Sequence, residues 1–254
     1  GEDTLSLHDA LPISLTTGLD NTDTSFGGVI SGTGNLVKEG TGTQILSGAS
    51  TYTGTTTLTA GGLQLGSGGT TGSIAGGNVI TSASTLLSFN RSNALALSNV
   101  ISGAGNVAQT GTGTTTLSGA STYTGTTTVS AGILKAGVAT VGTASGAFGV
   151  NSAVTLANVA GAALDITGFS NTIGSLSGGG ALGGNVTLGT ATLTAGGDNT
   201  STTFGGVMSG SGKLTKAGTG TMTMTGANTN SGITTINTGG TLRIFFFNDT
   251  ATTE

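Results

Sequence analysis

The sequence predicts an all-β fold, a single right-handed parallel β-helix (a solenoid) of about ten coils. Three observations carry this prediction: an internal repeat, a composition rich in glycine and nearly free of proline, and short strand-like runs that end at Gly or Asn. The repeat is clearest at residues 46–57, which read LSGASTYTGTTT, because residues 117–128 are identical to them. Repeats of one supersecondary unit indicate that successive units stack to bury a continuous core.

The repeat extends well beyond this stretch. Residues 29–66 align with residues 100–137 without a gap, and a third copy occupies residues 207–244. The third copy keeps the glycines at equivalent places, and its lead-in DNTSTTF echoes the DNTDTSF that precedes the first copy. The copies begin at uneven intervals, so we expect further coils to fill the residues between them.

The composition favours a stacked fold over disorder. The 254 residues include 50 glycines, one proline and no cysteine, with 6% charged and 35% hydrophobic residues. Disorder requires low hydrophobicity together with high net charge, and neither holds here. Glycine suits corners with positive φ, whereas proline would remove a donor from a strand ladder. No run approaches the roughly 18 apolar residues of a membrane-spanning helix.

Taken in order, the chain reads as short strands separated by corners. Residues 15–66 give SFGGVISG, GNLVKEG, GTQILSG and TTTLTAGGLQLG, and residues 67–99 give the weaker runs SIAGGNVIT, STLLSFN and ALALSNV. Residues 138–197 add AVTLANV, AALDITGF, NTIGSLSG and NVTLGTATLTAGG. These runs lack the apolar spacing of a helix. Residues 15–244 also lack the Asn-Gly or Asp-Gly signal of a tight hairpin, which favours parallel stacking over a sandwich.

Alternation within a strand assigns an inner and an outer side. In TGTTTLSG, Thr115 and Leu117 share one side, and Thr114, Thr116 and Ser118 share the other. The equivalents of the first pair in the third copy are Met222 and Met224. We therefore expect Thr115, Leu117 and both methionines to point inward.

At three positions this alternation would place a long polar residue inside. Each lies two positions after an inward apolar residue; they are Lys38, Gln109 and Lys216. Strict alternation would point them into the core, where a charged group is costly. We therefore predict that the strand ends and turns before each of them.

The two ends of the chain do not follow the pattern. Residues 4–14 read TLSLHDALPIS and residues 248–254 read NDTATTE, and both peptides resemble translated parts of a common sequencing adapter. We expect residues 1–14 and 245–254 to be artefacts of this origin, the alternative being an irregular cap at each end. Residues 15–244 would then form the β-helix and carry a net charge of +1 in place of −4, so the acidic balance is no guide to partners.

The repeat resembles a known family. The string GNLVKEGTGTQILSGASTYTGTTTLTAGGLQLG, at residues 34–66, and its two relatives resemble the autotransporter-associated β-strand repeat of bacterial autotransporter passenger domains and surface adhesins. Residues 163–180 resemble the coils that link such repeats. The resemblance implies a passenger fragment exported to the cell surface of a Gram-negative bacterium. A signal peptide and a C-terminal translocating barrel, the expected link to the outer membrane, are missing from the sequence.

The residues predict no catalytic, cofactor or metal site. Without His8 the chain has neither histidine nor cysteine, which removes the usual nucleophilic and zinc arrangements. The glycines of a GxGxxG pattern at residues 178–183 precede a strand-like run, whereas dinucleotide binding needs a helix there. Asp20, Asp23 and Asp198 offer too few ligands for calcium, and we interpret them as residues of solvated turns.

Two tyrosines are the candidate binding residues. Tyr52 and Tyr123 occupy the same place in two copies, and an exposed aromatic ladder there would contact carbohydrate. The alternative is ordinary packing within the ladder. The third copy has Asn230 at this place, which weakens the carbohydrate interpretation.

The predicted function is therefore a non-catalytic structural or adhesive stalk with an unknown glycan or protein ligand. The alternatives are a polysaccharide-binding β-helix protein, a polysaccharide-cleaving β-helix enzyme, which needs clustered carboxylates, and an ice-binding array of outward threonines. Six scattered cations do not form the basic stripe that nucleic-acid binding requires. Uncapped terminal coils would expose strand edges, so we also expect self-association through them.

Overall fold

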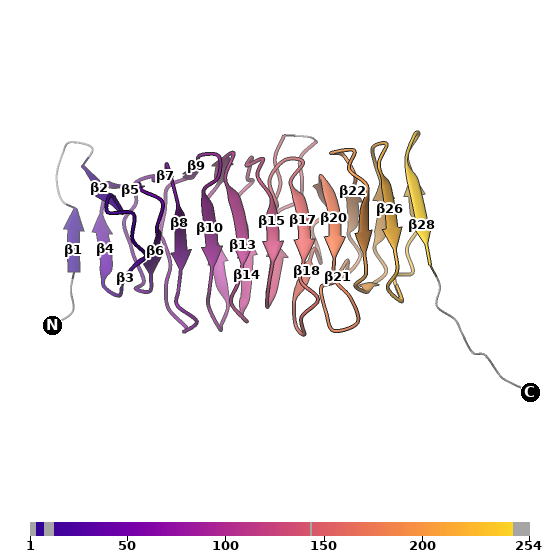
Figure 1. Ribbon diagram of the computed structural model, residues 1–254, viewed down its shortest axis with the longest axis horizontal. Helices are drawn as coiled ribbons and strands as arrows, with labels where there is room; N and C mark the ends of the chain where they lie inside the picture. Colours follow the sequence, from indigo (N-terminus) through magenta and orange to yellow (C-terminus); the bar gives the residue numbers. More distant parts are fainter. Residues whose placement is uncertain (1–3, 8–12, 143, 246–254) are drawn as a thin grey trace, which may run out of the picture.

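The chain folds into a parallel β-solenoid, described here from a computed structural model. The structure describes residues 4–7, 13–142 and 144–245. These residues form 28 short strands and no helix. Successive coils lie side by side along a rod (Figure 1). Every pairing between two strands is parallel, so the predicted all-β parallel architecture is confirmed.

One sheet runs along the rod from β3 to β28 and faces the viewer in Figure 1; we call it the long face. It contains eleven strands, one for each coil, which is close to the predicted ten coils. Its strands are β3 (Thr24–Phe26), β6 (Thr43–Leu46), β8 (Gly62–Leu65), β10 (Leu86–Phe89), β13 (Asn106–Gln109), β15 (Thr127–Val129), β17 (Ala153–Leu156), β20 (Ser175–Gly178), β23 (Thr202–Phe204), β26 (Thr221–Met224) and β28 (Thr241–Ile244).

Strands that come just before those of the long face in the chain form the leading face. It comprises a five-stranded sheet and a four-stranded sheet. The first contains β2 (Ser14–Thr17), β5 (Asn35–Lys38), β7 (Thr56–Leu58), β9 (Val79–Thr81) and β12 (Ile101–Gly103), and the second contains β19 (Asn171–Ile173), β22 (Thr192–Ala195), β25 (Lys213–Lys216) and β27 (Thr234–Ile236).

Strands that come just after those of the long face form the trailing face. It comprises a two-stranded sheet and a six-stranded sheet. The first contains β1 (Thr4–Leu7) and β4 (Val29–Gly32), and the second contains β11 (Leu95–Leu97), β14 (Thr114–Leu117), β16 (Ile133–Ala136), β18 (Ala163–Asp165), β21 (Asn185–Thr187) and β24 (Met208–Ser209). A full coil thus visits the leading, long and trailing faces in that order.

The inner sides of the three faces meet in one hydrophobic core. On the long face, the inward column includes Leu46, Leu65 and Phe89 in register, all buried. Thr115, Leu117, Met222 and Met224 are buried as the alternation predicts, whereas Thr114 and Thr116 are only half-buried. Stacked like residues therefore fill the interior along the rod.

The second repeat is turned by one face relative to the other two. In the first and third copies the second strand, β5 or β25, lies on the leading face and the next strand on the long face. In the second copy the second strand is β13 on the long face, and β14 follows on the trailing face. The same sequence can therefore build either of two corners of the coil.

The N-terminal boundary predicted at residue 14 is not a break in the fold. Residues 4–7 form β1 and pair with β4, and Ser14 opens β2, which pairs with β5. The rest of the two predicted artefact segments, residues 1–3, 8–12 and 246–254, lies outside the described residues, and their adapter origin stays a prediction. Within the described residues, no helix is long and apolar enough to cross a membrane.

Candidate functional site

The structure overturns the prediction for the three long polar residues. Lys38, Gln109 and Lys216 are the last residues of β5, β13 and β25, and all three are buried. The strands therefore do not turn before them. The alternation was right, and the expectation that these side chains avoid the interior was wrong.

Backbone carbonyls of the next corner explain how a lysine is tolerated there. The Lys38 ammonium donates hydrogen bonds to the carbonyls of Glu39 and Gly40, the second at 2.9 Å, and lies 3.5 Å from the carbonyl oxygen of Ala60 in the following coil. Burial lowers the pKa of Lys38, and the charges of Asp20 and Asp23 oppose this shift. The side chain thus ties two successive coils together at one corner.

The third and second copies show two versions of this corner. Lys216 donates to the carbonyls of Ala217 and Gly218, the second at 3.1 Å. Gln109 uses its Nε2 to donate to the carbonyls of Gly111 at 2.7 Å and Gly113 at 3.2 Å. Each long side chain therefore donates hydrogen bonds to backbone carbonyls of its corner.

The structure also contradicts the exposed tyrosine ladder. Tyr52 and Tyr123 are fully buried. The Tyr52 amide bonds to Ile30 of β4 on the trailing face, and the Tyr123 amide bonds to Ile101 of β12 on the leading face. Because the second copy is turned by one face, the two rings lie on different sides of the coil and form no common ladder. Neither ring offers a face to a sugar.

Hydrogen bonds within the corner hold both phenol groups. The Tyr52 hydroxyl lies 2.5 Å from Thr56 Oγ1, and the Tyr123 hydroxyl lies 2.7 Å from Thr127 Oγ1. Burial raises the pKa of Tyr52 to about 12 and raises that of Tyr123 further. The tyrosines therefore act as packing residues that stay protonated.

The acidic residues hold turns. Asp20 accepts hydrogen bonds from the amide and hydroxyl of Thr22, which lower its pKa, and Asp198 accepts the same pair from Thr200. Asp165 pairs with Lys135 at 3.0 Å. No group of three or more His, Cys, Asp or Glu side chains in the described part of the chain is placed to hold a metal ion.

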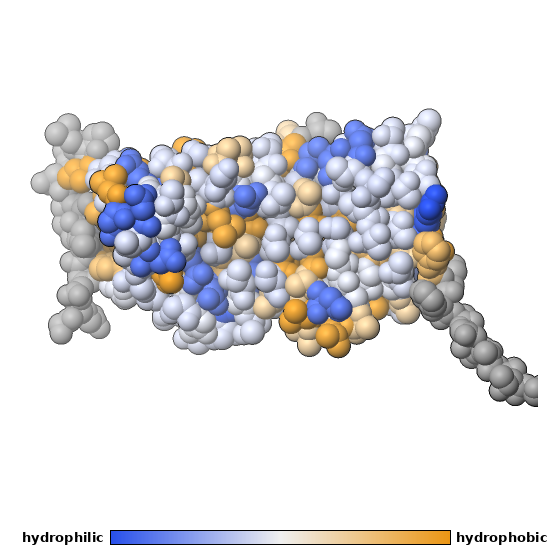
Figure 2. Space-filling view, viewed as in Figure 1, coloured by the Kyte–Doolittle hydropathy of each residue, from blue (hydrophilic) through white to orange (hydrophobic). Residues whose placement is uncertain are grey.

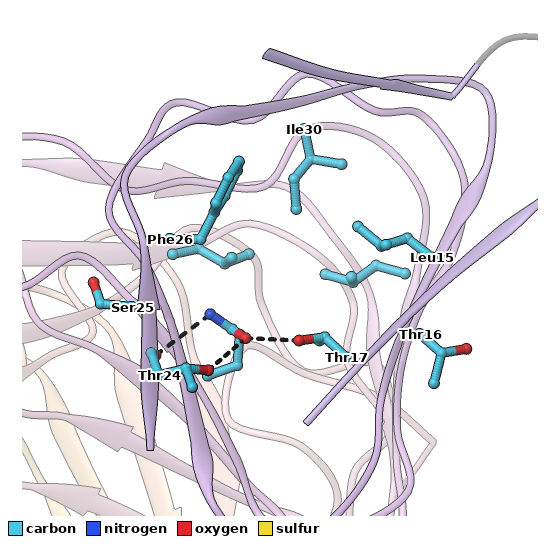
Figure 3. Close-up of a pocket in the computed structure, with 10 residues that line it drawn as sticks. Leu15, Thr16, Thr17, Thr24, Ser25, Phe26 and Ile30 are labelled. Carbon is cyan, nitrogen blue, oxygen red and sulfur yellow. Dashed lines mark hydrogen bonds between the residues drawn. The ribbon is translucent and has the colours of Figure 1, made fainter. Parts of the chain in front are cut away.

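A small, half-open pocket lies at the first described coils. Its volume is about 230 Å³, and Leu15, Phe26 and Ile30 supply apolar walls (Figure 3). Its one amide, that of Gln44, accepts hydrogen bonds from the hydroxyls of Thr17 at 2.7 Å and Thr24 at 2.9 Å. Because these polar groups already bond one another, we do not assign a ligand to this pocket.

Comparisons with known proteins match the three repeats. The model of the family described as passenger-associated-transport-repeat matches residues 36–65, 107–136 and 214–244. Each match spans four consecutive strands and lies within one of the three copies defined by the sequence. No solved structure matches the chain.

A curated relative is an adhesin. The adhesin BmaC autotransporter of Brucella suis biovar 1 (strain 1330) is 39% identical over 194 residues, which cover 76% of this chain and 5% of the relative. The aligned region is thus a small part of that protein. This chain thus carries three matches to the passenger-associated-transport-repeat family in one solenoid, and it is similar over most of its length to part of an autotransporter adhesin.

Proposed function

We propose that this chain is a non-catalytic rod segment of an autotransporter passenger, displayed on the surface of a Gram-negative bacterium, where it spaces or presents an adhesive region. The observation that carries the proposal is the stacking of three passenger repeats and their linking coils on one continuous sheet. The similarity to an autotransporter adhesin supports the same role.

The shape and interior suit a spacer. Eleven strands at a spacing of about 4.8 Å give a rod of the order of 50 Å. The interior is filled by buried apolar side chains along this length, so each coil supports its neighbours. Because each coil packs on its neighbours, we expect the rod to hold its two ends at a fixed separation.

A segment exchange in the relative tests the proposal. The stretch of the BmaC adhesin that aligns with this chain is replaced by residues 15–244, and surface display and cell adhesion are measured. We expect both to be retained. The control is Leu134→Asp in the inserted segment, which buries a charge in the core and should abolish display. A folded, displayed insert that destroys adhesion would contradict the spacing role.

A further inference from the structure

The C-terminal half of the long face carries a continuous run of hydroxyl side chains. The outward residues of successive strands, in register, are Thr128, Thr155, Ser177, Thr203, Thr223 and finally Arg243. The earlier part of the same column is mixed, because Ile45, Gln64 and Ala108 interrupt the hydroxyl residues Ser25 and Ser88. An uninterrupted run of hydroxyls is therefore found only in the later coils of the sheet.

A second column widens this run near its end. Ser201 lies just ahead of β23, two residues before Thr203, and Thr221 opens β26, two residues before Thr223. The Ser201 hydroxyl accepts a hydrogen bond from the Thr221 amide at 3.0 Å. The space between the two columns forms a shallow groove of about 280 Å³, lined by Ser201, Thr202, Thr203, Thr221, Thr223 and Arg243. Figure 2 shows that the face over β20 and β26 is covered by weakly polar residues.

Charge at the groove has one sign. Arg243 is exposed, and the groove lining contains no acidic residue. The ion pair between Lys135 and Asp165 is the one salt bridge found among the described residues, so Arg243 forms none with the described carboxylates. A guanidinium in this position can take a carboxylate or sulfate with two parallel hydrogen bonds.

From this geometry we propose that the groove binds an acidic polysaccharide laid along the rod axis. The strand spacing of about 4.8 Å is close to the advance of one sugar residue in an extended chain, so hydroxyls of successive coils can meet successive sugars. Ser and Thr hydroxyls both donate and accept hydrogen bonds, as sugar hydroxyls require, and Arg243 selects an acidic group. This site goes beyond the spacer role and does not depend on it.

Matched ligands test the chemical class. Binding of the full chain to polygalacturonate is compared, by titration calorimetry, with binding to its methyl-esterified form, which keeps the backbone and removes the charge. We expect the acid form to bind about tenfold more tightly, a factor that corresponds to about 1.4 kcal/mol. Equal affinity for the two forms, or no binding to either, would overturn the proposal.

Three variants locate the site. Arg243→Gln should lower affinity for the acid form about tenfold and leave the ester form unchanged. The double variant Thr203→Val and Thr223→Val keeps the β-branched shape and should weaken both forms. Lys213→Gln removes an equal charge from an exposed residue of β25 on the leading face and should change neither. A loss in Lys213→Gln equal to that in Arg243→Gln would mean that only net charge matters and would refute a localised groove.

Discussion

Lys38 shows how a solenoid buries a long polar residue at a corner. Lys38→Met keeps the apolar stem but removes the donors to Glu39 and Gly40, so we expect a loss of about 2 kcal/mol in the free energy of unfolding, measured in urea. Lys38→Gln should cost less than about 1 kcal/mol, because Gln109 already holds the equivalent corner through its Nε2.

Lys135 provides the matched control for that experiment. Its side chain is partly exposed and pairs with Asp165 at the surface, so Lys135→Met should change stability by less than about 1 kcal/mol. Equal losses at Lys38 and Lys135 would contradict a specific role for the buried ammonium.

The tyrosines predict how stability depends on alkaline pH. The pKa of Tyr52 rises to about 12 in the folded state, against about 10 when unfolded. The folded state therefore holds more protons in this range, and stability is full below pH 10 and falls as pH rises toward 12. The lowered pKa of Lys38 and Lys216 has the opposite effect. The folded state then binds fewer protons than the unfolded state, so stability rises as pH approaches the ordinary lysine pKa.

Removing the phenol groups separates the tyrosine contribution to the pH dependence of stability from the lysine contribution. The double variant Tyr52→Phe and Tyr123→Phe should lose about 1 kcal/mol per hydroxyl at neutral pH and should no longer lose stability above pH 10. Urea unfolding between about pH 8 and pH 11 measures both effects. An unchanged alkaline decline in the double variant would show that the tyrosines do not cause it.

At the residue scale, the sequence predicted which side chains point inward but not what the polar ones do there. The alternation through Leu36 and Lys38 was correct. The error came from assuming that an ammonium must reach water, whereas carbonyls of a corner can satisfy it. A usable signal was present in the strings KEG, QTG and KAG, where a long donor precedes a corner glycine by two residues in all three copies.

At the element scale, stacked corners explain a glycine that recurs in every copy. A Cβ at Gly54 would overlap the carbonyl oxygen of Gly34 in the preceding coil, and Gly125 and Gly232 meet Gly105 and Gly212 in the same way. Gly54→Ala should therefore destabilise the fold by about 2 kcal/mol or more, since backbone atoms must shift. Gly69→Ala is the control, because nothing lies within 4 Å of its Cβ. Thermal unfolding compares the two, and equal melting temperatures would contradict close stacking at this corner.

The strands themselves were predictable, but their faces were not. Short β-rich runs with glycine corners give the strand positions, and the lack of hairpin signals gives the parallel pairing. Which face a copy occupies depends on how many residues each linking coil uses, and the irregular segments between copies hide this number. The one-face turn of the second copy, which separates Tyr123 from Tyr52, could not be read from the repeat.

At the scale of the whole molecule, stability should vary along the rod. Each coil contacts only its neighbours, so a central coil is held on two sides. On the leading face all three residues of β27 are exposed, and β28 pairs only with β26 among the described strands. We expect amide hydrogen exchange to be slowest in β13, β15 and β17 and fastest in β27 and β28. Uniform protection along the chain would contradict coil-by-coil stability.

The last described coil also predicts association through its edge. Ile236 and Ile244 are 49% and 47% exposed on β27 and β28, and β28 offers backbone groups on a side where the structure places no further strand among the described residues. An exposed apolar edge strand is a template for pairing with another chain. We expect the protein to form larger species as its concentration rises, and Ile244→Lys to reduce them, as followed by light scattering. Phe169→Lys, on a partly exposed residue of a middle coil, adds the same charge away from the edge and should leave association unchanged. A similar reduction in both variants would show that solubility, and not the edge, controls assembly.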